Sequence, residues 1–151
     1  MDEIKLAESW LSSIGFTVVR WSEVERLIDQ CLHLIAKGNN TQKKPTRLNG
    51  KLEYIERHLN ERLPSFMGHE LIMKTKAASQ LRDVFVHGIV EGFDNEVIRM
   101  SKIQGKEKDY VREVFEVNIV RLNNSQENID YLIGGWSDVV GFLINESDFN
   151  S

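Results

Sequence analysis

The feature that most constrains the fold is a long helical pattern between Ser22 and Gly38. Ser22 and Glu25 form a capping box, in which each side chain satisfies a backbone N–H that the first turn of a helix leaves unpaired. A broad apolar face follows at helical spacing and comprises Val24, Leu27, Ile28, Cys31, Leu32, Leu34 and Ile35. We therefore predict a helix over about residues 22–37, ended by Gly38.

Other segments show the same period more weakly. Residues 2–14 have a loose helical stripe, which we expect Gly15 to end, with residues 16–19 as a short extended link. Further helices are predicted over about residues 50–62, 69–87 and 126–145. Asn124 and Ser125 are the expected cap of the last of these helices. Within it, Gly134 and Gly135 cost helix stability, so we expect close packing against a neighbour there.

Between the last two predicted helices the period changes from helical to alternating. Residues 97–103 and 111–122 are rich in β-branched and aromatic side chains, and a turn containing Gly105 separates them. This pattern favours a β-hairpin within about residues 96–122, with helix as the alternative for part of residues 108–120. The fold expected is mainly α: a single domain over residues 1–151, built as a four- to five-helix up-and-down bundle with an inserted β-hairpin before the last helix.

Composition sets the class of protein. The chain has 151 residues, of which 41% are hydrophobic and 28% charged, as in a soluble globular protein. Its net charge of -4 excludes a uniformly basic nucleic-acid-binding surface but leaves room for a local basic patch. The acidic N-terminus is unlike a signal peptide, and no apolar run is long enough to span a membrane. The only cysteine, Cys31, has no partner for a disulfide. We expect a cytoplasmic protein without membrane contact.

A basic segment lies between the first two strong helices. It contains Lys43, Lys44, Arg47 and Lys51, with no acidic residue among them. A solvated loop is one interpretation. The other is an RNA-binding edge in which these side chains contact phosphates.

The candidate catalytic residues lie at the end of the helix predicted over residues 69–87. Asp83 and His87 are four residues apart and share a helix face, so the carboxylate can orient the imidazole. Arg82 is five residues before His87, which places it about 140° away around an ideal helix. A fraying last turn, or a second copy of the helix across a two-fold axis, would bring an arginine and a histidine together. No sequence pattern typical of a metal or cofactor site is present, and none is expected.

Residues 82–87, with the sequence RDVFVH, resemble the R-x4–6-H motif of HEPN domains. The order of helices over roughly residues 20–145 is also similar to that family. Two further segments, from Arg26 to His33 and from Arg62 to His69, share the spacing, but only residues 82–87 end an apolar helix before a glycine. The chain departs from many active members in having Asp83 where they have asparagine, and in its hairpin.

The resemblance implies a helical homodimer that cleaves RNA without a metal ion, as a toxin or defence component. His87 would act as acid or base near neutral pH, Arg82 would bind the phosphate, and Asp83 would orient His87. The products would carry 2′,3′-cyclic phosphates. The alternative that the family also contains is a non-catalytic binding module, such as an antitoxin or the partner of a nucleotidyltransferase. In that case the motif residues form surface ion pairs and a helix cap.

Overall fold

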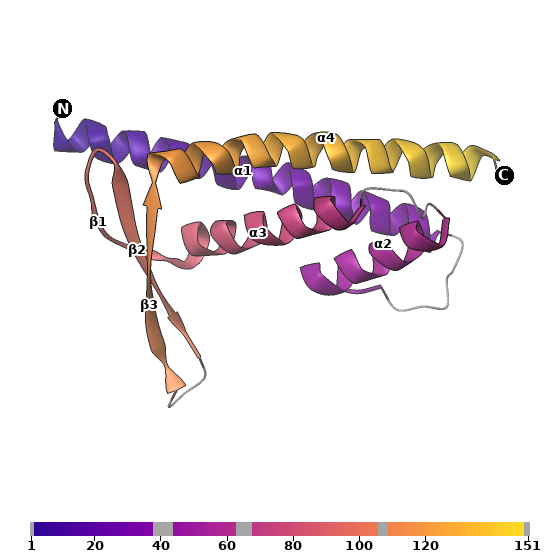
Figure 1. Ribbon diagram of the computed structural model, residues 1–151, viewed down its shortest axis with the longest axis horizontal. Helices are drawn as coiled ribbons and strands as arrows, with labels where there is room; N and C mark the ends of the chain where they lie inside the picture. Colours follow the sequence, from indigo (N-terminus) through magenta and orange to yellow (C-terminus); the bar gives the residue numbers. More distant parts are fainter. Residues whose placement is uncertain (1, 38–43, 63–67, 106–108, 150–151) are drawn as a thin grey trace. The chain divides into compact units, whose positions relative to one another are not determined.

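The computed structural model describes residues 2–37, 44–62, 68–105 and 109–149. In these ranges the chain is mainly helical, with one small sheet directly before the last helix, as the sequence predicts. The elements in chain order are α1 (Glu3–Ala36), α2 (Leu48–Arg62), α3 (Gly68–His87), β1 (Ile89–Phe93), β2 (Val97–Gln104), β3 (Val111–Asn118) and α4 (Ile119–Phe149) (Figure 1). Among the described helices, none has the length and apolar character needed to cross a membrane.

The first helix is continuous, so the predicted break at Gly15, the extended link over residues 16–19 and the helix start with a capping box at Ser22 are wrong. One stripe of buried residues alternates in steps of three and four along the whole helix: Trp10, Ile14, Thr17, Trp21, Val24, Ile28 and Cys31. Gly15 lies on the exposed side, where a Cβ atom would meet nothing within 4 Å. Thr17 fits the stripe because its hydroxyl donates a hydrogen bond to the Ser13 carbonyl at 2.9 Å.

The chain divides into two compact units, to which α1, α3 and α4 each contribute a segment. The sheet unit consists of Met1–Trp21 and Ala78–Ile129, and therefore contains all three strands. The helical unit consists of Ser22–Ala77 and Asp130–Ser151, and contains α2.

The sheet has three antiparallel strands in the order β1-β2-β3, one more than the predicted hairpin. The turn between β1 and β2 is built on Asp94, whose carboxylate accepts hydrogen bonds at 2.8 Å from the backbone N–H groups of Glu96 and Val97. Ile89 and Val90 in β1 are both exposed. In β1, buried and exposed residues do not alternate, so the sequence pattern does not predict a strand there. Its hydrogen bonds to β2 hold it extended.

The boundary between β3 and α4 lies earlier than predicted. The helix begins at Ile119, not at residue 126, because the Asn118 side chain accepts a hydrogen bond at 2.7 Å from the Arg121 backbone N–H and caps the first turn. Ser125, expected in the cap, instead donates to the Leu122 carbonyl inside the helix at 2.7 Å. β-branched residues favour strand locally, but a good N-cap at Asn118 starts the helix.

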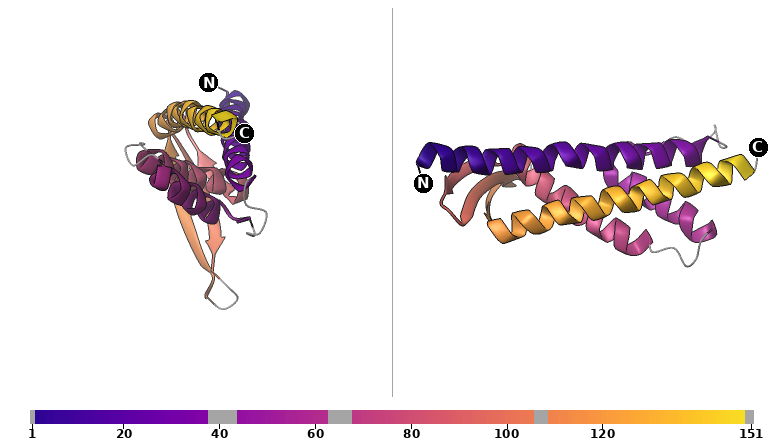
Figure 2. Two further views of the ribbon diagram at one scale, coloured as in Figure 1. Left: turned by 90° about the vertical axis from the view of Figure 1, so that its right-hand side faces the viewer. Right: turned by 90° about the horizontal axis from the view of Figure 1, so that it is seen from above.

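The core of the sheet unit joins one face of the sheet to three helix segments. Its buried members are Trp10, Ile14, Leu81, Val84, Phe85, Ile98, Met100, Val117 and Leu122. The Trp10 indole also donates a hydrogen bond at 2.8 Å to the Asp94 carbonyl, at the turn between β1 and β2. Figure 2 shows the N-terminal part of α1 running beside the strands. The end of α3 is therefore fixed against the sheet by apolar packing.

The core of the helical unit contains a buried polar pair. Thr75 donates to the Leu71 carbonyl at 2.7 Å and accepts from the Trp136 indole N–H at 3.0 Å. Close packing at the glycine pair of α4 is confirmed for Gly135, where a Cβ atom would lie 2.7 Å from the Leu71 side chain. It is wrong for Gly134, which faces open space.

Replacing Thr75 by valine keeps the shape of the side chain but leaves the buried indole N–H of Trp136 without its acceptor. We expect Thr75→Val to lower the free energy of unfolding by about 1–3 kcal/mol, measured by urea denaturation. Thr75→Ser, which keeps the hydroxyl, is the matched control. A loss as large in the serine variant would show that the methyl group matters more than the hydrogen bond.

A single residue, Gly88, connects α3 to β1. Its N–H donates to the Val84 carbonyl at 2.7 Å, and a Cβ atom would lie 2.4 Å from the same oxygen and 3.2 Å from the Met100 side chain. We expect Gly88→Ala to cost about 1–3 kcal/mol of stability, because backbone must move. Gly15→Ala, which fills open space on a helix, should instead stabilise by up to about 1 kcal/mol. Equal effects of the two substitutions in thermal unfolding would contradict this account.

Candidate functional site

The predicted motif lies in the last two turns of α3. The Nε2 atom of His87 is 3.6 Å from Oδ1 of Asp83, as their helical spacing predicts. The imidazole is 58% exposed and the Asp83 side chain 39%. A solvent-accessible histidine therefore lies beside a carboxylate that is able to orient it.

Lys102 is a member of this cluster that the sequence pattern did not reveal. It lies on β2, and its ammonium group bonds to Oδ2 of Asp83, the oxygen not nearest His87. The hydrogen bond from Lys102 lowers the pKa of the Asp83 carboxyl, and the positive charges of Lys102, His87 and Arg82 act in the same direction. Asp83 is thus held ionised by the hydrogen bond from Lys102, with His87 beside its other oxygen.

The signal that points to Lys102 is the alternation of β2. Residues 98, 100 and 102 share one face of the strand, and Ile98 and Met100 on that face are buried in the core beside α3. Lys102 is the next residue on the face, and its side chain is only 23% exposed. Knowing the strand pairing is enough to place it near α3, but which residue it meets depends on the packing.

Arg82 occupies a different position on the helix. Its Nε atom is buried and has no hydrogen-bond partner in the described part of the chain. Within the same residues no hydrogen bond or ion pair joins Arg82 to His87. The structure therefore brings together Asp83, His87 and Lys102, and leaves Arg82 with an unsatisfied donor.

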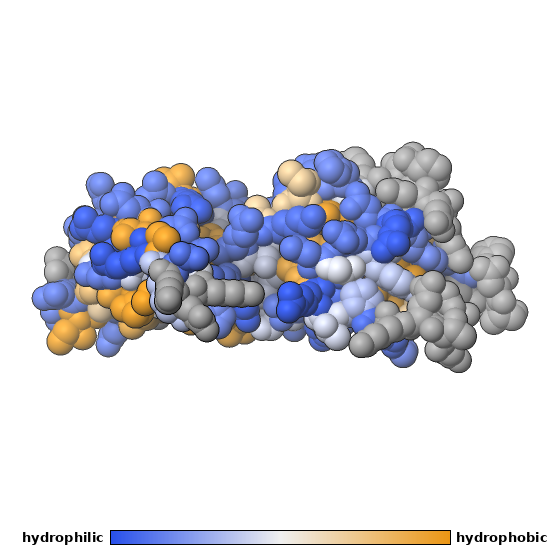
Figure 3. All heavy atoms as spheres, turned by 90° about the horizontal axis from the view of Figure 1, so that it is seen from below, coloured by the Kyte–Doolittle hydropathy of each residue, from blue (hydrophilic) through white to orange (hydrophobic). Residues whose placement is uncertain are grey.

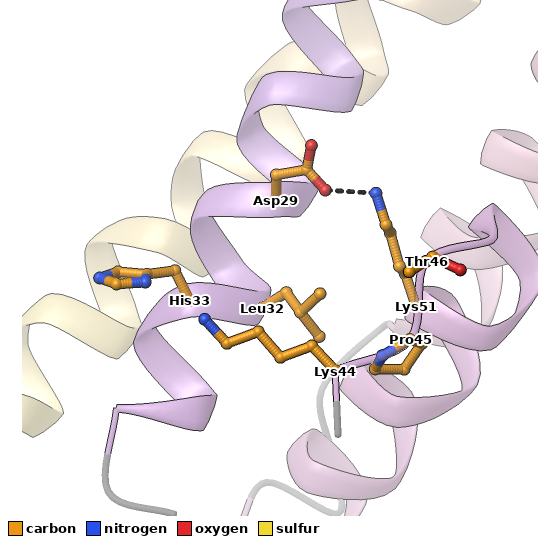
Figure 4. Close-up of a pocket in the computed structure, with 7 residues that line it drawn as sticks. All are labelled: Asp29, Leu32, His33, Lys44, Pro45, Thr46 and Lys51. Atoms are coloured by element: carbon orange, nitrogen blue, oxygen red, sulfur yellow. Dashed lines mark hydrogen bonds and ion pairs between the residues drawn. The ribbon is translucent and has the colours of Figure 1, made fainter. Parts of the chain in front are cut away.

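The predicted basic segment is only partly described, because Lys43 lies outside the described residues. Lys44 and Arg47 are exposed. Lys51 instead forms an ion pair with Asp29 of α1 at 2.6 Å, so an acidic residue distant in sequence offsets its charge (Figure 4). The positive charge of the basic segment is therefore partly offset, although the segment itself contains no acidic residue.

An open hollow of about 350 Å³ lies beside this ion pair in the helical unit. Its walls combine Lys44 with apolar and polar side chains of α1 and of the segment that precedes α2 (Figure 4). They include Leu32, His33, Pro45 and Thr46.

The described residues contain neither a cluster arranged for a metal ion nor an ionised thiol. No group of three or more His, Cys, Asp or Glu side chains in those residues is arranged to hold a metal ion. The Cys31 thiol is fully buried, and burial raises its pKa to about 12, so it stays protonated at neutral pH.

Comparisons with protein-family models, with curated proteins and with solved structures find no match for this chain.

The hydrogen bond from Lys102 to Asp83 should make the stability of the fold depend on pH. The pKa of Asp83 in the folded protein is lowered from the ordinary aspartate value of about 3.9. The ionised carboxylate therefore stabilises the fold at pH values above about 3.9, and this stabilisation is lost as the pH falls through the lowered pKa. Replacing Lys102 by methionine should move the Asp83 pKa upward, toward the ordinary value. Carboxyl NMR titration of the two proteins measures this directly. Lys76→Met, at another lysine, is the control, and an unchanged Asp83 pKa in Lys102→Met would contradict the assignment.

Proposed function

We propose that the protein is a metal-independent endoribonuclease of the HEPN type, with its reaction site at the end of α3. The observation that supports the proposal best is the solvent-accessible His87 beside the ionised Asp83, with two further cationic side chains, Arg82 and Lys102, acting on the same carboxylate. Histidine is the side chain that most often acts as a general acid or base.

The proposed reaction is an attack by the 2′-hydroxyl of RNA on the adjacent phosphorus. His87 takes the proton of the 2′-hydroxyl, the bond from phosphorus to the 5′-oxygen breaks, and the imidazolium so formed gives the proton to that oxygen, so that a 2′,3′-cyclic phosphate and a 5′-hydroxyl result. The Arg82 guanidinium would donate to the phosphate oxygens through its terminal nitrogen atoms, since its Nε atom is buried. Asp83 would act as a positioning residue for His87.

The separation of Arg82 and His87 by about 140° around the helix favours a homodimer, in which two copies complete each reaction site. Lys43, Lys44, Arg47 and Lys51 remain predicted RNA contacts. Of these, Lys44 and Arg47 are the better candidates, because they are exposed and Lys51 is engaged by Asp29. A cytoplasmic location is part of the same proposal.

The second candidate function is a non-catalytic interaction module, such as an antitoxin or the partner of a nucleotidyltransferase. It is favoured by the bond between Lys102 and Asp83, since a carboxylate shared by a lysine and a histidine is also an ordinary surface ion-pair network.

The test is incubation of mixed RNA with the purified protein in EDTA, alongside His87→Ala and Arg82→Ala. We expect the wild type to cut RNA and both variants to lose at least about 100-fold in rate, the usual contribution of a general acid or base. His69→Ala is the matched control, because His69 is an exposed histidine at the other end of α3 and should be dispensable. End-group analysis should find 2′,3′-cyclic phosphates.

Two outcomes would refute the ribonuclease proposal. One is a folded wild type that leaves every RNA intact, which would favour the interaction module. The other is undiminished cleavage by His87→Ala, which would place the activity elsewhere.

A further inference from the structure

The outer edge of β3 offers a row of backbone groups to a partner. Among the strands that the structure describes, which have the order β1-β2-β3, the third strand has a neighbour on one side only. The Ile119 N–H donates to the Glu96 carbonyl at 2.9 Å, next to the pair Val97–Asn118. This bond identifies which opposed residue pairs of β2 and β3 are hydrogen-bonded to each other. Because bonded and non-bonded pairs alternate in an antiparallel ladder, the backbone groups of Arg112, Val114 and Glu116 point away from β2.

A second hydrogen bond agrees with this assignment. The Arg121 guanidinium donates to the Glu116 carbonyl oxygen at 3.4 Å, so that oxygen is not directed at β2. This contact is long and exposed, and a strand partner is able to displace it.

The two edges of the sheet differ in their protection. Edge strands avoid unwanted pairing by means of bulges, prolines and lysines. The first strand has a register irregularity between Val90 and Gly92, whereas β3 pairs regularly with β2 along its whole length and contains neither proline nor lysine. Val111 and Val114 on β3 are 63% and 49% exposed. The edge that is open is therefore regular and partly apolar.

We infer that β3 pairs, antiparallel, with β3 of a second copy of this chain, with Val114 on the two-fold axis. The two sheets then form one six-stranded sheet. In this register Arg112 lies opposite Glu116 of the partner subunit, and the reverse pair forms on the other side of the axis. The three residues alternate on one face of the strand, so the pairs are directly cross-strand and of opposite charge.

The charges of Arg112 and Glu116, on either side of Val114, favour this register and a second copy of the chain as the partner. Moving the axis by one residue, to Glu113 or Phe115, sets Val114 against a charged residue and leaves Arg112 without an acid opposite it. Moving it by half a residue pairs outward-facing with inward-facing backbone groups. Arg112 already contacts Glu91 at 2.6 Å, while Glu116 has no ion pair in the described residues and is open to one.

Apolar surface supports the same pairing. Ile103 on β2 is 64% exposed and lies diagonally beside Val114, on the face opposite the core. Two copies joined at Val114 bring these side chains into one continuous strip across the new sheet. Figure 3 shows hydrophobic residues at the surface on one side of the molecule. This interface does not involve the face of α3 on which the proposed ribonuclease depends. Pairing through β3 and RNA cleavage are therefore tested independently.

Sedimentation equilibrium of the full chain tests the inference. We expect the wild type to self-associate as its concentration rises, and Val114→Pro to form assemblies of half that mass, because it loses the step through β3 and keeps any step through α3. Proline removes an outward N–H that β2 does not use, so the monomer fold, followed by circular dichroism, should persist. Glu116→Arg changes only an exposed side chain and should raise the dimer dissociation constant about tenfold, because two attractive pairs become repulsive. A wild type that stays monomeric, or a dimer indifferent to Glu116→Arg, would overturn the inference.

Cross-linking distinguishes this interface from any other dimer. A cysteine at Val114 should be captured as a covalent dimer by a short bifunctional maleimide, since its copy lies directly opposite. A cysteine at Ile103, equally exposed but on the central strand, is the matched control and should react at least tenfold more slowly. The native Cys31 is buried and does not interfere. Equal capture at both positions would count against pairing through β3.

Discussion

Burial of one continuous stripe along α1 is the constraint on which both compact units depend. Trp10 and Ile14 belong to the core of the sheet unit, and Val24, Ile28 and Cys31 are buried in the segment that belongs to the helical unit. A glycine inside a helix costs about 1 kcal/mol, whereas burying a tryptophan contributes several kcal/mol. Because the stripe contains two tryptophans and Gly15 lies on the opposite side, packing outweighs the local preference for a break.

The electrostatics of the candidate site follow from a short connection. Only Gly88 separates α3 from β1, and β2 pairs with β1, so β2 is brought against the last turns of α3. Met100 approaches Gly88, and Lys102, two residues further on the same face, reaches Asp83. The carboxylate that the helix alone would direct to His87 is therefore shared with a lysine.

The site divides into a local part and a distant part. The pair Asp83 and His87 is predictable because helical geometry alone places residues four apart on one face. Lys102 was not, since it is 19 residues from Asp83 and meets it only through strand register and sheet packing. The pairing of Lys51 with Asp29, 22 residues away, was missed for the same reason, and it removes one charge from the predicted basic segment.

The sequence by itself determined what depends on periodicity: the helical class, the bounds of α2 and α3 to within two residues, the strand character before the last helix, and the face shared by Asp83 and His87. Only the tertiary structure decided the continuity of α1 and the first strand, whereas the start of α4 depends on a local cap at Asn118. Each of these positions has weak or conflicting local preferences. The result there depends on burial along the α1 stripe, on a ladder supplied by β2 and on one hydrogen bond to Asn118, and the first two involve residues distant in sequence.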